Sequence, residues 1–282
     1  RRYMLKETLA LPILGGWFGK NGTGNLETLM ASKPEIVLNI GDTKQSGVDL
    51  ADRIERQTGI PVLVIDNELS DTAKVYEMLG LLLGKEEKAR ELGEYCTKAY
   101  RDVERLSAAI PEAERVRFYY AEGIKGLETD FEASRHCEAF RLAGGANVCK
   151  SGEDSGFGRA LLSMEQVLLW QPDAIFVGRD KGEDTDQLPL WTQDAKWQSL
   201  PAFRNKRVYQ IPDAPFNWMD RPPSVNRVIG IRWAFWCLYP DKVDYDMAAE
   251  TRKFFHLFYH YEMSADEARK LLEDSKLKTA HE

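Results

Sequence analysis

The chain has 282 residues, of which 43% are apolar and 29% are charged, and its net charge is −7. This composition is typical of a globular protein with one large domain or two of medium size. Lys and Arg form no long cluster, so the sequence argues against a nucleic-acid-binding surface. No run of 18 apolar residues occurs, and a membrane-spanning helix is therefore not predicted.

The sequence carries only weak signals of cellular location. Residues 1–6 lack the apolar core of a signal peptide, a segment that exported proteins lose on maturation. The four cysteines are widely spaced and include no CxxC pair, which argues against a structural zinc site. Cys137 and Cys149 could form a disulfide in an oxidising compartment. We favour free thiols, because lone buried cysteines behave as small apolar residues.

The first distinctive segment is a loop, residues 15–24, with five glycines in ten positions. Such a loop directly before a helix lets a ligand approach the backbone, and its Trp17 and Phe18 could cover that ligand. A plain connection between a strand and a helix is the alternative. The loop is not a Walker P-loop, because no Gly-Lys-Ser/Thr step closes it.

The next segment, residues 25–41, has a counterpart at residues 163–178. Each copy predicts a short amphipathic helix that ends near a proline, followed by a buried strand that ends at glycine. In each copy a glutamate, Glu27 or Glu165, stands seven positions before that proline. Because the copies are far apart in the sequence, they indicate matching elements of two lobes rather than neighbouring repeats of a solenoid.

Strands and helices alternate through the first part of the chain. We predict strands at 36–40 and 61–65 with a helix at 47–57 between them, an order that gives a parallel sheet. From 71 to 109 the pattern is almost purely helical. Its last part, from about residue 86, predicts one helix roughly 35 Å long at about 1.5 Å per residue, enough to run between two lobes.

A second alternation of strands and helices begins after Pro111. We expect, in chain order, a strand at 116–120, a helix at 132–143, a strand at 174–177, a short helix at 191–197, a strand at 207–211 and helices at 225–238, 246–261 and 264–272. Ser264 and Glu267 form the capping pattern of the last helix. A mainly parallel sheet flanked by helices is therefore predicted here as well.

The segment at residues 212–224 concentrates unusual side chains. Trp218, Asp220 and Arg221 follow a predicted strand, and ligands of α/β proteins bind where strands end. Two prolines exclude a helix there. We interpret the segment as the lining of a binding site, with a proline-rich surface loop as the alternative.

Several segments, in this order and spacing, resemble a known family: Asn25-Leu-Glu27 with Lys33-Pro34-Glu35, then residues 79–89, 142–148, 163–175 and 208–211. The chain resembles the substrate-binding proteins of ABC importers for iron-siderophores, haem and vitamin B12, of the class III or helical-backbone type. The resemblance covers nearly the whole chain.

The resemblance implies two α/β lobes, each with a central, mainly parallel sheet flanked by helices, joined by one long rigid helix with the ligand between the lobes. The N-terminal lobe would comprise residues 1–70 and the C-terminal lobe residues 111–282. Residues 71–110 between them would form helices, one of which is the connecting helix. We expect a monomer in the periplasm or outside the cell, and a lipid anchor on a preceding segment is compatible with this location.

The resemblance also implies a partner. In the family, one glutamate on each lobe docks into arginine pockets of the permease dimer, which works with its ATPase subunits. The matching positions here are Glu27 and Glu165. Exposed carboxylates at fixed separation give orientation and association rate more than affinity. Ordinary solvated helix charges are the alternative for each of them.

The chain departs from the family pattern in two respects. Members begin with a strand and a helix ahead of the glycine-rich loop, whereas this chain opens almost on it, so we expect a first lobe shortened at its N-terminus. Vitamin B12 binders carry Trp six residues before each docking glutamate, where this chain has Asn21 and Arg159. An amide and a guanidinium suit an anionic or oxygen-rich cargo better than a corrin ring.

Other candidate ligand-binding residues follow from their chemistry. Arg159, Arg179 and Arg221 could neutralise an anionic chelate, because a guanidinium donates parallel hydrogen bonds to carboxylate or catecholate oxygens. Five aromatic side chains could cover a flat ligand, although each is also typical of a core: Trp17, Phe18, Tyr120, Phe157 and Trp218.

The main candidate for direct contact with a metal is His136, the one histidine ahead of the C-terminal region. The companions that we expect are Glu122, Tyr119 and Tyr120, at the end of the preceding strand. An imidazole with a carboxylate or a phenolate suits ferric iron or nickel.

We therefore predict a non-catalytic binding protein that captures a metal complex, foremost a ferric siderophore or a haem-like iron chelate, and delivers it to an ABC permease. Molybdate, tungstate, nickel-histidine or cobalamin are alternative cargoes on the same fold. An intracellular α/β enzyme is the alternative from another class, but no GxSxG motif and no Ser-His-Asp spacing support it. Neither a catalytic residue nor a catalytic cofactor is predicted.

Overall fold

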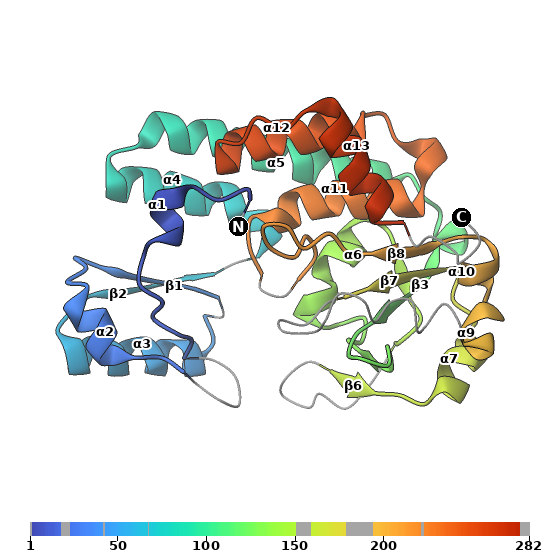
Figure 1. Cartoon of the computed structure of the whole chain (residues 1–282), viewed down its shortest axis with the longest axis horizontal. Coiled ribbons are helices and arrows are strands. Elements are labelled where there is room, and N and C mark those ends of the chain that lie inside the picture. Colours follow the sequence, from blue (N-terminus) through green and yellow to red (C-terminus); the bar gives the residue numbers. More distant parts are fainter. Residues whose placement is uncertain are drawn as a thin grey trace. The chain divides into compact units, whose positions relative to one another are not determined.

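The computed structural model describes residues 2–17, 23–41, 43–66, 68–150, 159–178, 194–220 and 223–276. The chain forms two compact units, unit 1 (Arg1–Glu94) and unit 2 (Tyr95–Glu282). The boundary lies inside a long helix, α5 (Glu86–Ala108), which Figure 1 shows. Among the described residues, no helix has both the length and the apolar character needed to cross a membrane.

Unit 1 contains a two-stranded parallel sheet and several helices. Its elements are α1 (Lys6–Leu9), α2 (Leu26–Ala31), β1 (Val37–Gly41), α3 (Gln45–Thr58), β2 (Val62–Asp66), a 3-10 turn (Leu69–Asp71), α4 (Thr72–Leu83) and the first part of α5. Strands β1 and β2 are parallel, with Val37 beside Val62, because α3 returns the chain to the same edge of the sheet.

A small apolar cluster holds unit 1 together. Leu29 of α2 and Ile54 of α3 are buried in it, and Val37 of β1 packs against them. Burial alternates along β1, as the two-residue period of a strand requires. On the other face of this strand, Leu38 and Ile40 are 37% and 52% exposed. One face of β1 is therefore open to solvent.

Unit 2 is built on a four-stranded parallel sheet with the order β5-β3-β7-β8. Its strands are β3 (Arg117–Ala121), β5 (Ala146–Asn147), β7 (Ala174–Val177) and β8 (Val208–Gln210), and a separate antiparallel pair is formed by β4 (Glu128–Thr129) and β6 (Ala160–Leu161). Its helices are α6 (Glu138–Leu142), α7 (Met164–Trp170), α9 (Ala195–Gln198), α10 (Pro201–Arg204), α11 (Asn226–Leu238), α12 (Met247–Tyr259) and α13 (Ala265–Asp274). Short 3-10 turns lie at Glu112–Glu114, Arg135–Cys137 and Pro240–Lys242.

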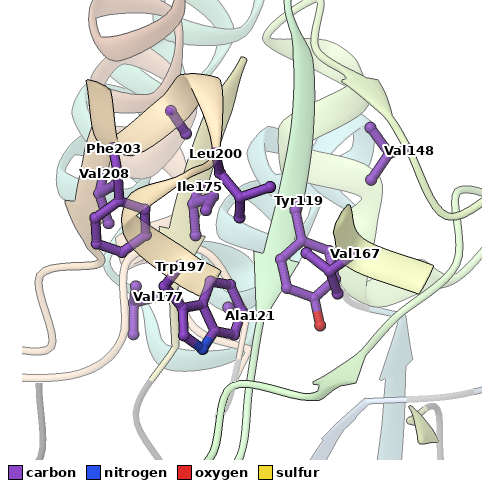
Figure 2. Packing of buried hydrophobic residues seen from close by; sticks show 11 residues of the cluster. Tyr119, Ala121, Val148, Val167, Ile175, Val177, Trp197, Leu200, Phe203 and Val208 are labelled. Atoms are coloured by element: carbon purple, nitrogen blue, oxygen red, sulfur yellow. The ribbon is translucent and has the colours of Figure 1, made fainter. Parts of the chain in front are cut away.

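Alternate residues of the unit 2 strands point to opposite faces of the sheet. On one face, Tyr119 of β3 and Ile175 of β7 pack with Trp197 of α9 and with Leu200, as Figure 2 shows. Val167 of α7 joins this cluster. The short helices α7 and α9 therefore cover this face.

Aromatic rings cover the opposite face of the same sheet. Phe118 of β3 stacks on Phe140 of α6 with their ring centroids 4.9 Å apart. Phe176 of β7 contacts Phe140 and the ring of Trp233 in α11. Because helices cover both faces, every residue of β7 is buried.

Ion pairs of the buried Arg232 connect the helices of unit 2. In α11, Nη2 of Arg232 lies 2.7 Å from Oδ2 of Asp102 in α5, and Nη1 lies 3.3 Å from Oε2 of Glu250 in α12. Tyr95 of α5 donates a hydrogen bond to the Glu250 carboxylate at 3.4 Å. These three helices are thus fixed by charge as well as by apolar packing.

The predicted α/β fold with parallel sheets flanked by helices is confirmed. The helix predicted at 132–143 is shorter, because the Ser134 hydroxyl accepts a hydrogen bond from the His136 N–H and starts a 3-10 turn ahead of α6. The strands β4, β5 and β6 were missed, because two residues show no alternation. The division of the chain into two lobes at 1–70 and 111–282 and the connecting role of α5 stay predictions.

Candidate functional site

Polar side chains gather where the strands of unit 2 end. Glu122 follows β3 directly, Gly178 follows β7, and the segment after β8 leads to Asp220. The carboxyl ends of parallel strands meet at one edge of a sheet, where α/β proteins bind ligands. At this edge Gly178 is tightly surrounded, because an added Cβ would lie 3.1 Å from the Tyr120 ring and 3.4 Å from Cγ of Glu122.

Arg159 forms ion pairs with two glutamates at this edge. Its Nη2 lies 3.0 Å from Oε1 of Glu122, and its Nη1 lies 3.2 Å from Oε2 of Glu128. The main-chain N–H groups of Glu122 and Glu128 each donate to the other's carbonyl oxygen, which fixes the two side chains near each other. We expected Arg159 to offer its charge to an anionic cargo, and here that charge is offset by two carboxylates.

A second cluster joins His136 to two aspartates. Nδ1 of His136 lies 2.6 Å from Oδ1 of Asp220. One donor atom each from Asp130, His136 and Asp220 lie within 4.8 Å of one another. Asp130 is 0% and Asp220 3% exposed, whereas the His136 side chain is 31% exposed. The imidazole is therefore the member of the cluster that reaches solvent.

Neighbouring polar groups fix the position of Asp130. The Ser134 hydroxyl donates a hydrogen bond to Oδ1 of Asp130 at 3.0 Å and accepts one from the His136 N–H at 3.2 Å. The buried amide of Asn147 donates to the Asp130 carbonyl oxygen at 2.9 Å. Because the Ser134 hydroxyl contacts both the Asp130 carboxylate and the His136 main chain, it links Asp130 to the start of the turn that carries His136.

The segment that carries Asp220 is anchored on α11. Oδ1 of Asn217 accepts hydrogen bonds from the N–H groups of Met219 and Asp220, at 2.8 and 3.0 Å. The carbonyl oxygen of Trp218 would lie 1.7 Å from a Cβ placed on Gly230, so only glycine allows this approach. Asp220 is thus held by a loop with little room to move.

The cysteines of unit 2 are free and buried, as we expected for Cys137 and Cys149. Burial raises the pKa of the Cys137 thiol, and the carboxylates of Asp130 and Asp220 raise it further. Burial raises the pKa of Cys96 to about 12. These thiols are protonated at neutral pH, and a protonated thiol is a poor nucleophile and a poor metal ligand.

The predicted aromatic contacts with a ligand lie in the two cores. Trp17 packs against the apolar cluster of unit 1. Tyr120 and Trp218 are fully buried, and the indole N–H of Trp218 donates to the carbonyl oxygen of Ala214. Tyr120 and Trp218 thus show core packing, which was the alternative, whereas Trp17 is only partly buried. Five further predicted ligand-binding residues lie outside the described residues: Phe18, Asn21, Phe157, Arg179 and Arg221.

The companions expected for His136 also differ from those observed. Tyr119 is buried in the sheet, where its hydroxyl donates to the Gly126 carbonyl oxygen at 2.8 Å. Asp220, which was predicted as a ligand-binding residue, contacts the imidazole instead. Asp130 was missed. Its signal in the sequence is weak, an acid in a loop shortly before the Ser134 that begins a helical turn.

The two glutamates predicted to dock on a permease occupy equivalent places. Glu27 and Glu165 are exposed and are each the second residue of a short helix. Oε1 of Glu165 lies 3.4 Å from Nζ of Lys196. The pKa of Glu165 is lowered, chiefly by a hydrogen bond from its own main-chain N–H and then by Lys196.

Comparisons with known proteins give the family. The profile of the periplasmic binding proteins matches residues 18–215, more than half of the chain. The chain belongs to the periplasmic binding protein family. A similar solved structure is the ABC transporter solute binding protein from Sulfurospirillum deleyianum, which is 33% identical in sequence to this periplasmic binding protein. The match covers 96% of this chain and 82% of the Sulfurospirillum chain, and its TM-score is 0.88.

Two curated relatives are named for different cargoes. The molybdate-binding protein MolA of Haemophilus influenzae is 25% identical over 93% of this chain and 76% of its own length. A vitamin B12-binding protein of Vibrio parahaemolyticus is 25% identical over 73% of this chain and 70% of its own length. Since one fold serves both, the fold does not name the cargo.

As a periplasmic binding protein of class III, the chain is a non-catalytic, substrate-binding component of an ABC importer. Proteins of this kind work in the periplasm or outside the cell. The prediction of a binding protein is confirmed, and the enzyme alternative is set aside.

Proposed function

We propose that this periplasmic binding protein captures a metal complex, foremost a ferric chelate, and delivers it to its ABC permease. The observation that carries the proposal is the contact of His136 with Asp220 beside Asp130, in the strand-end region of unit 2. Oxygen donors and an imidazole suit ferric iron and similar metals.

The charge of this region supports a cargo with a cationic centre. Among the described residues, its two clusters contain four carboxylates, those of Glu122, Glu128, Asp130 and Asp220, and the guanidinium of Arg159. Carboxylates attract a metal centre and repel a bare oxyanion. Molybdate, the cargo in the name of the Haemophilus influenzae relative, is therefore the second candidate.

Delivery would use Glu27 and Glu165 as contacts with the permease. Both carboxylates are exposed at the first turn of a helix, and a hydrogen bond from its own main-chain N–H, followed by Lys196, lowers the pKa of Glu165. Exposed charges of this kind set the orientation and rate of association. Import of the cargo, rather than its capture, would depend on them.

A thermal-shift panel tests the cargo. Its ligands are ferric siderophores, ferric nitrilotriacetate, haem, nickel-histidine, cobalamin, molybdate and tungstate, and each chelator without metal serves as the matched control. A ligand at 100 times its Kd stabilises the folded protein by about 2.7 kcal/mol, which raises Tm by several degrees for a chain of this size.

The expected result is a rise in Tm with a ferric chelate and none with the free chelator. A rise with molybdate or cobalamin alone would refute the proposed cargo while leaving the binding role in place. A rise with the free chelator equal to that with the ferric complex would show that the metal is not recognised.

A further inference from the structure

The cluster of Asp130, His136 and Asp220 in unit 2 indicates how the metal of the proposed cargo would be bound. Resting on the proposed function, we infer that Asp130, His136 and Asp220 coordinate the cargo metal directly, as three protein ligands on one side of the ion. Their donor atoms already lie within 4.8 Å of one another.

One ion fits after the side chains shift. Each bond from a nitrogen or carboxylate oxygen to a metal such as zinc is about 2.0–2.2 Å long, so neighbouring ligands on one side of an ion lie about 3 Å apart. The donor atoms lie within 4.8 Å of one another, so shifts of up to about 2 Å bring them to this spacing. His136 and Asp220, now 2.6 Å apart, would separate as the ion enters between them.

Burial explains why a cation is favoured there. Asp130 and Asp220 are both shielded from solvent, and two carboxylates close together repel each other unless a positive charge lies between them. A divalent or trivalent ion bound by the imidazole would supply this positive charge.

The surroundings hold the ligands in place before an ion arrives. The hydroxyl of Ser134 binds the Asp130 carboxylate, and Asn217 fixes the main chain at Asp220. Partners of this kind orient metal ligands and raise metal affinity. Because His136 is the partly exposed member, the ion would approach from the imidazole side.

Direct coordination narrows the class of cargo. Three protein ligands take half of an octahedral coordination sphere, which leaves three positions for a chelator or for water. A chelator that fills all six positions has no place for these ligands. The cargo is therefore an aquated metal ion, or a complex whose chelator supplies about three donors, such as a hydroxycarboxylate or an amino acid.

Metal binding by the metal-free protein tests the inference. The probes are Co²⁺ alone, followed by its visible absorption, and ferric nitrilotriacetate, followed by equilibrium dialysis. The wild-type chain is expected to bind one ion, and His136→Gln, Asp130→Asn and Asp220→Asn are each expected to weaken binding at least tenfold, about 1.4 kcal/mol. His256→Gln is the matched control, since this imidazole pairs with Glu262 on an exposed surface and should leave binding unchanged.

The outcomes separate this inference from the proposed function. Failure of the wild type to bind either probe, or equal affinity in His136→Gln, would overturn direct coordination. If a chelate found by the thermal-shift panel binds His136→Gln as tightly as the wild type, the proposed function stands and direct coordination does not. If Co²⁺ binding depends on the cluster but no chelate raises Tm, coordination stands and the proposed chelate cargo does not.

A folding control keeps the test decisive. Circular dichroism and thermal melting of each variant show whether it is folded. The aspartates are buried, so their asparagine variants could fail to fold, whereas His136 is 31% exposed and its glutamine variant is expected to fold. Binding by His136→Gln then decides the question without the other two.

Discussion

The two copies of the repeated segment share their local structure. Asn25 caps α2 by accepting a hydrogen bond from the Thr28 N–H, and Ser163 caps α7 in the same way at the Gln166 N–H. Both helices are followed by a residue with positive φ directly before proline, at position 33 and position 171. The likeness therefore extends from the sequence to the backbone.

The copies differ in what surrounds the strand. In the part of the chain that the structure describes, β1 of unit 1 pairs with β2 alone, whereas β7 of unit 2 lies between β3 and β8. Leu38 of β1 is 37% exposed, and Phe176, at the matching place after the proline, is fully buried. Local sequence thus determines the helix, turn and strand, and neighbouring elements determine burial.

The largest effect that we predict comes from truncating these matched residues. Phe176→Ala should lower the free energy of unfolding by about 3–5 kcal/mol, because it leaves a cavity among the rings of Phe118, Phe140 and Trp233. Leu38→Ala should lower it by about 1 kcal/mol, because part of that side chain is already in contact with water. Urea unfolding followed by circular dichroism measures both.

Equal losses would remove the contrast between the two strands. They would mean that the open face of β1 is packed in solution as tightly as β7. The slope of the unfolding transition must stay the same in both variants for the comparison to hold, since a changed slope indicates a change in the surface exposed on unfolding.

The second prediction concerns alkaline pH, where the buried thiols of unit 2 should lower the free energy of unfolding of the protein. Burial raises the pKa of Cys96 from 9.0 to about 12, so the folded protein keeps a proton that the unfolded chain loses above about pH 9. Stability is therefore fully present below that pH and falls as the pH rises towards 12. The loss is about 1.4 kcal/mol per pH unit for each such group.

Urea unfolding at pH 8, 10 and 11 measures this loss. Cys96→Ala is the matched variant. Above pH 9 its free energy of unfolding should fall less steeply with pH than that of the wild type, and the difference is the contribution of the one thiol that was removed. An unchanged slope would show that Cys96 ionises as readily in the folded protein as in the unfolded chain.

The sequence was a good guide to helices with long periodic patterns and to short apolar strands with clear boundaries. The strand at Ala174–Val177 was predicted to the residue, since four apolar residues bounded by Pro172 and Gly178 leave little choice. The open face of β1 could not be predicted, because an apolar run looks the same whether one sheet face or both are covered. Burial is a property of the tertiary neighbours and not of the run itself.

The candidate site was less predictable for the same reason. His136 and Asp220 are 84 positions apart, and nothing local in the sequence pairs them. The aromatic residues Tyr120 and Trp218 were placed near a ligand by their type, but an aromatic ring is equally suited to a core. Asp130 has no motif around it, and it enters the cluster because the fold brings the residue directly after β4 close to His136 and Asp220.

The third prediction compares the two exposed glutamates, Glu27 and Glu165. Glu27→Gln and Glu165→Gln should each slow association with the permease roughly tenfold, because steering by complementary charge acts mainly on the association rate. Cargo affinity should not change. Import into proteoliposomes that contain the permease and its ATPase, together with cargo binding in solution, measures the two quantities separately.

Glu87→Gln is the control for charge alone, since Glu87 is also exposed in the first turn of a helix, α5. Import at the wild-type rate in both docking variants would refute the docking role. Loss of cargo affinity in either variant would place that carboxylate in the binding site or in the folded core instead.

The smallest effect that we predict lies at the positive-φ residues of the two copies. Lys33 and Gln171 both have φ of 46°, a conformation that costs a residue with a side chain about 1–2 kcal/mol more than glycine. Lys33→Gly should therefore raise the free energy of unfolding by about 0.5–1 kcal/mol, after the entropy that glycine adds to the unfolded chain is subtracted. Ser32→Gly, at a helical φ of −74°, should lower it and serves as the control of opposite sign.

Gln171→Gly should give almost no gain, although its φ is the same. The side-chain amide of Gln171 donates a hydrogen bond to the Leu168 carbonyl oxygen at 2.7 Å, and losing it removes about 0.5–1.5 kcal/mol. Thermal or urea unfolding of the two variants side by side measures the difference. An equal gain in both would show that this hydrogen bond adds nothing to stability, and that the two helix ends are alike in energy as well as in shape.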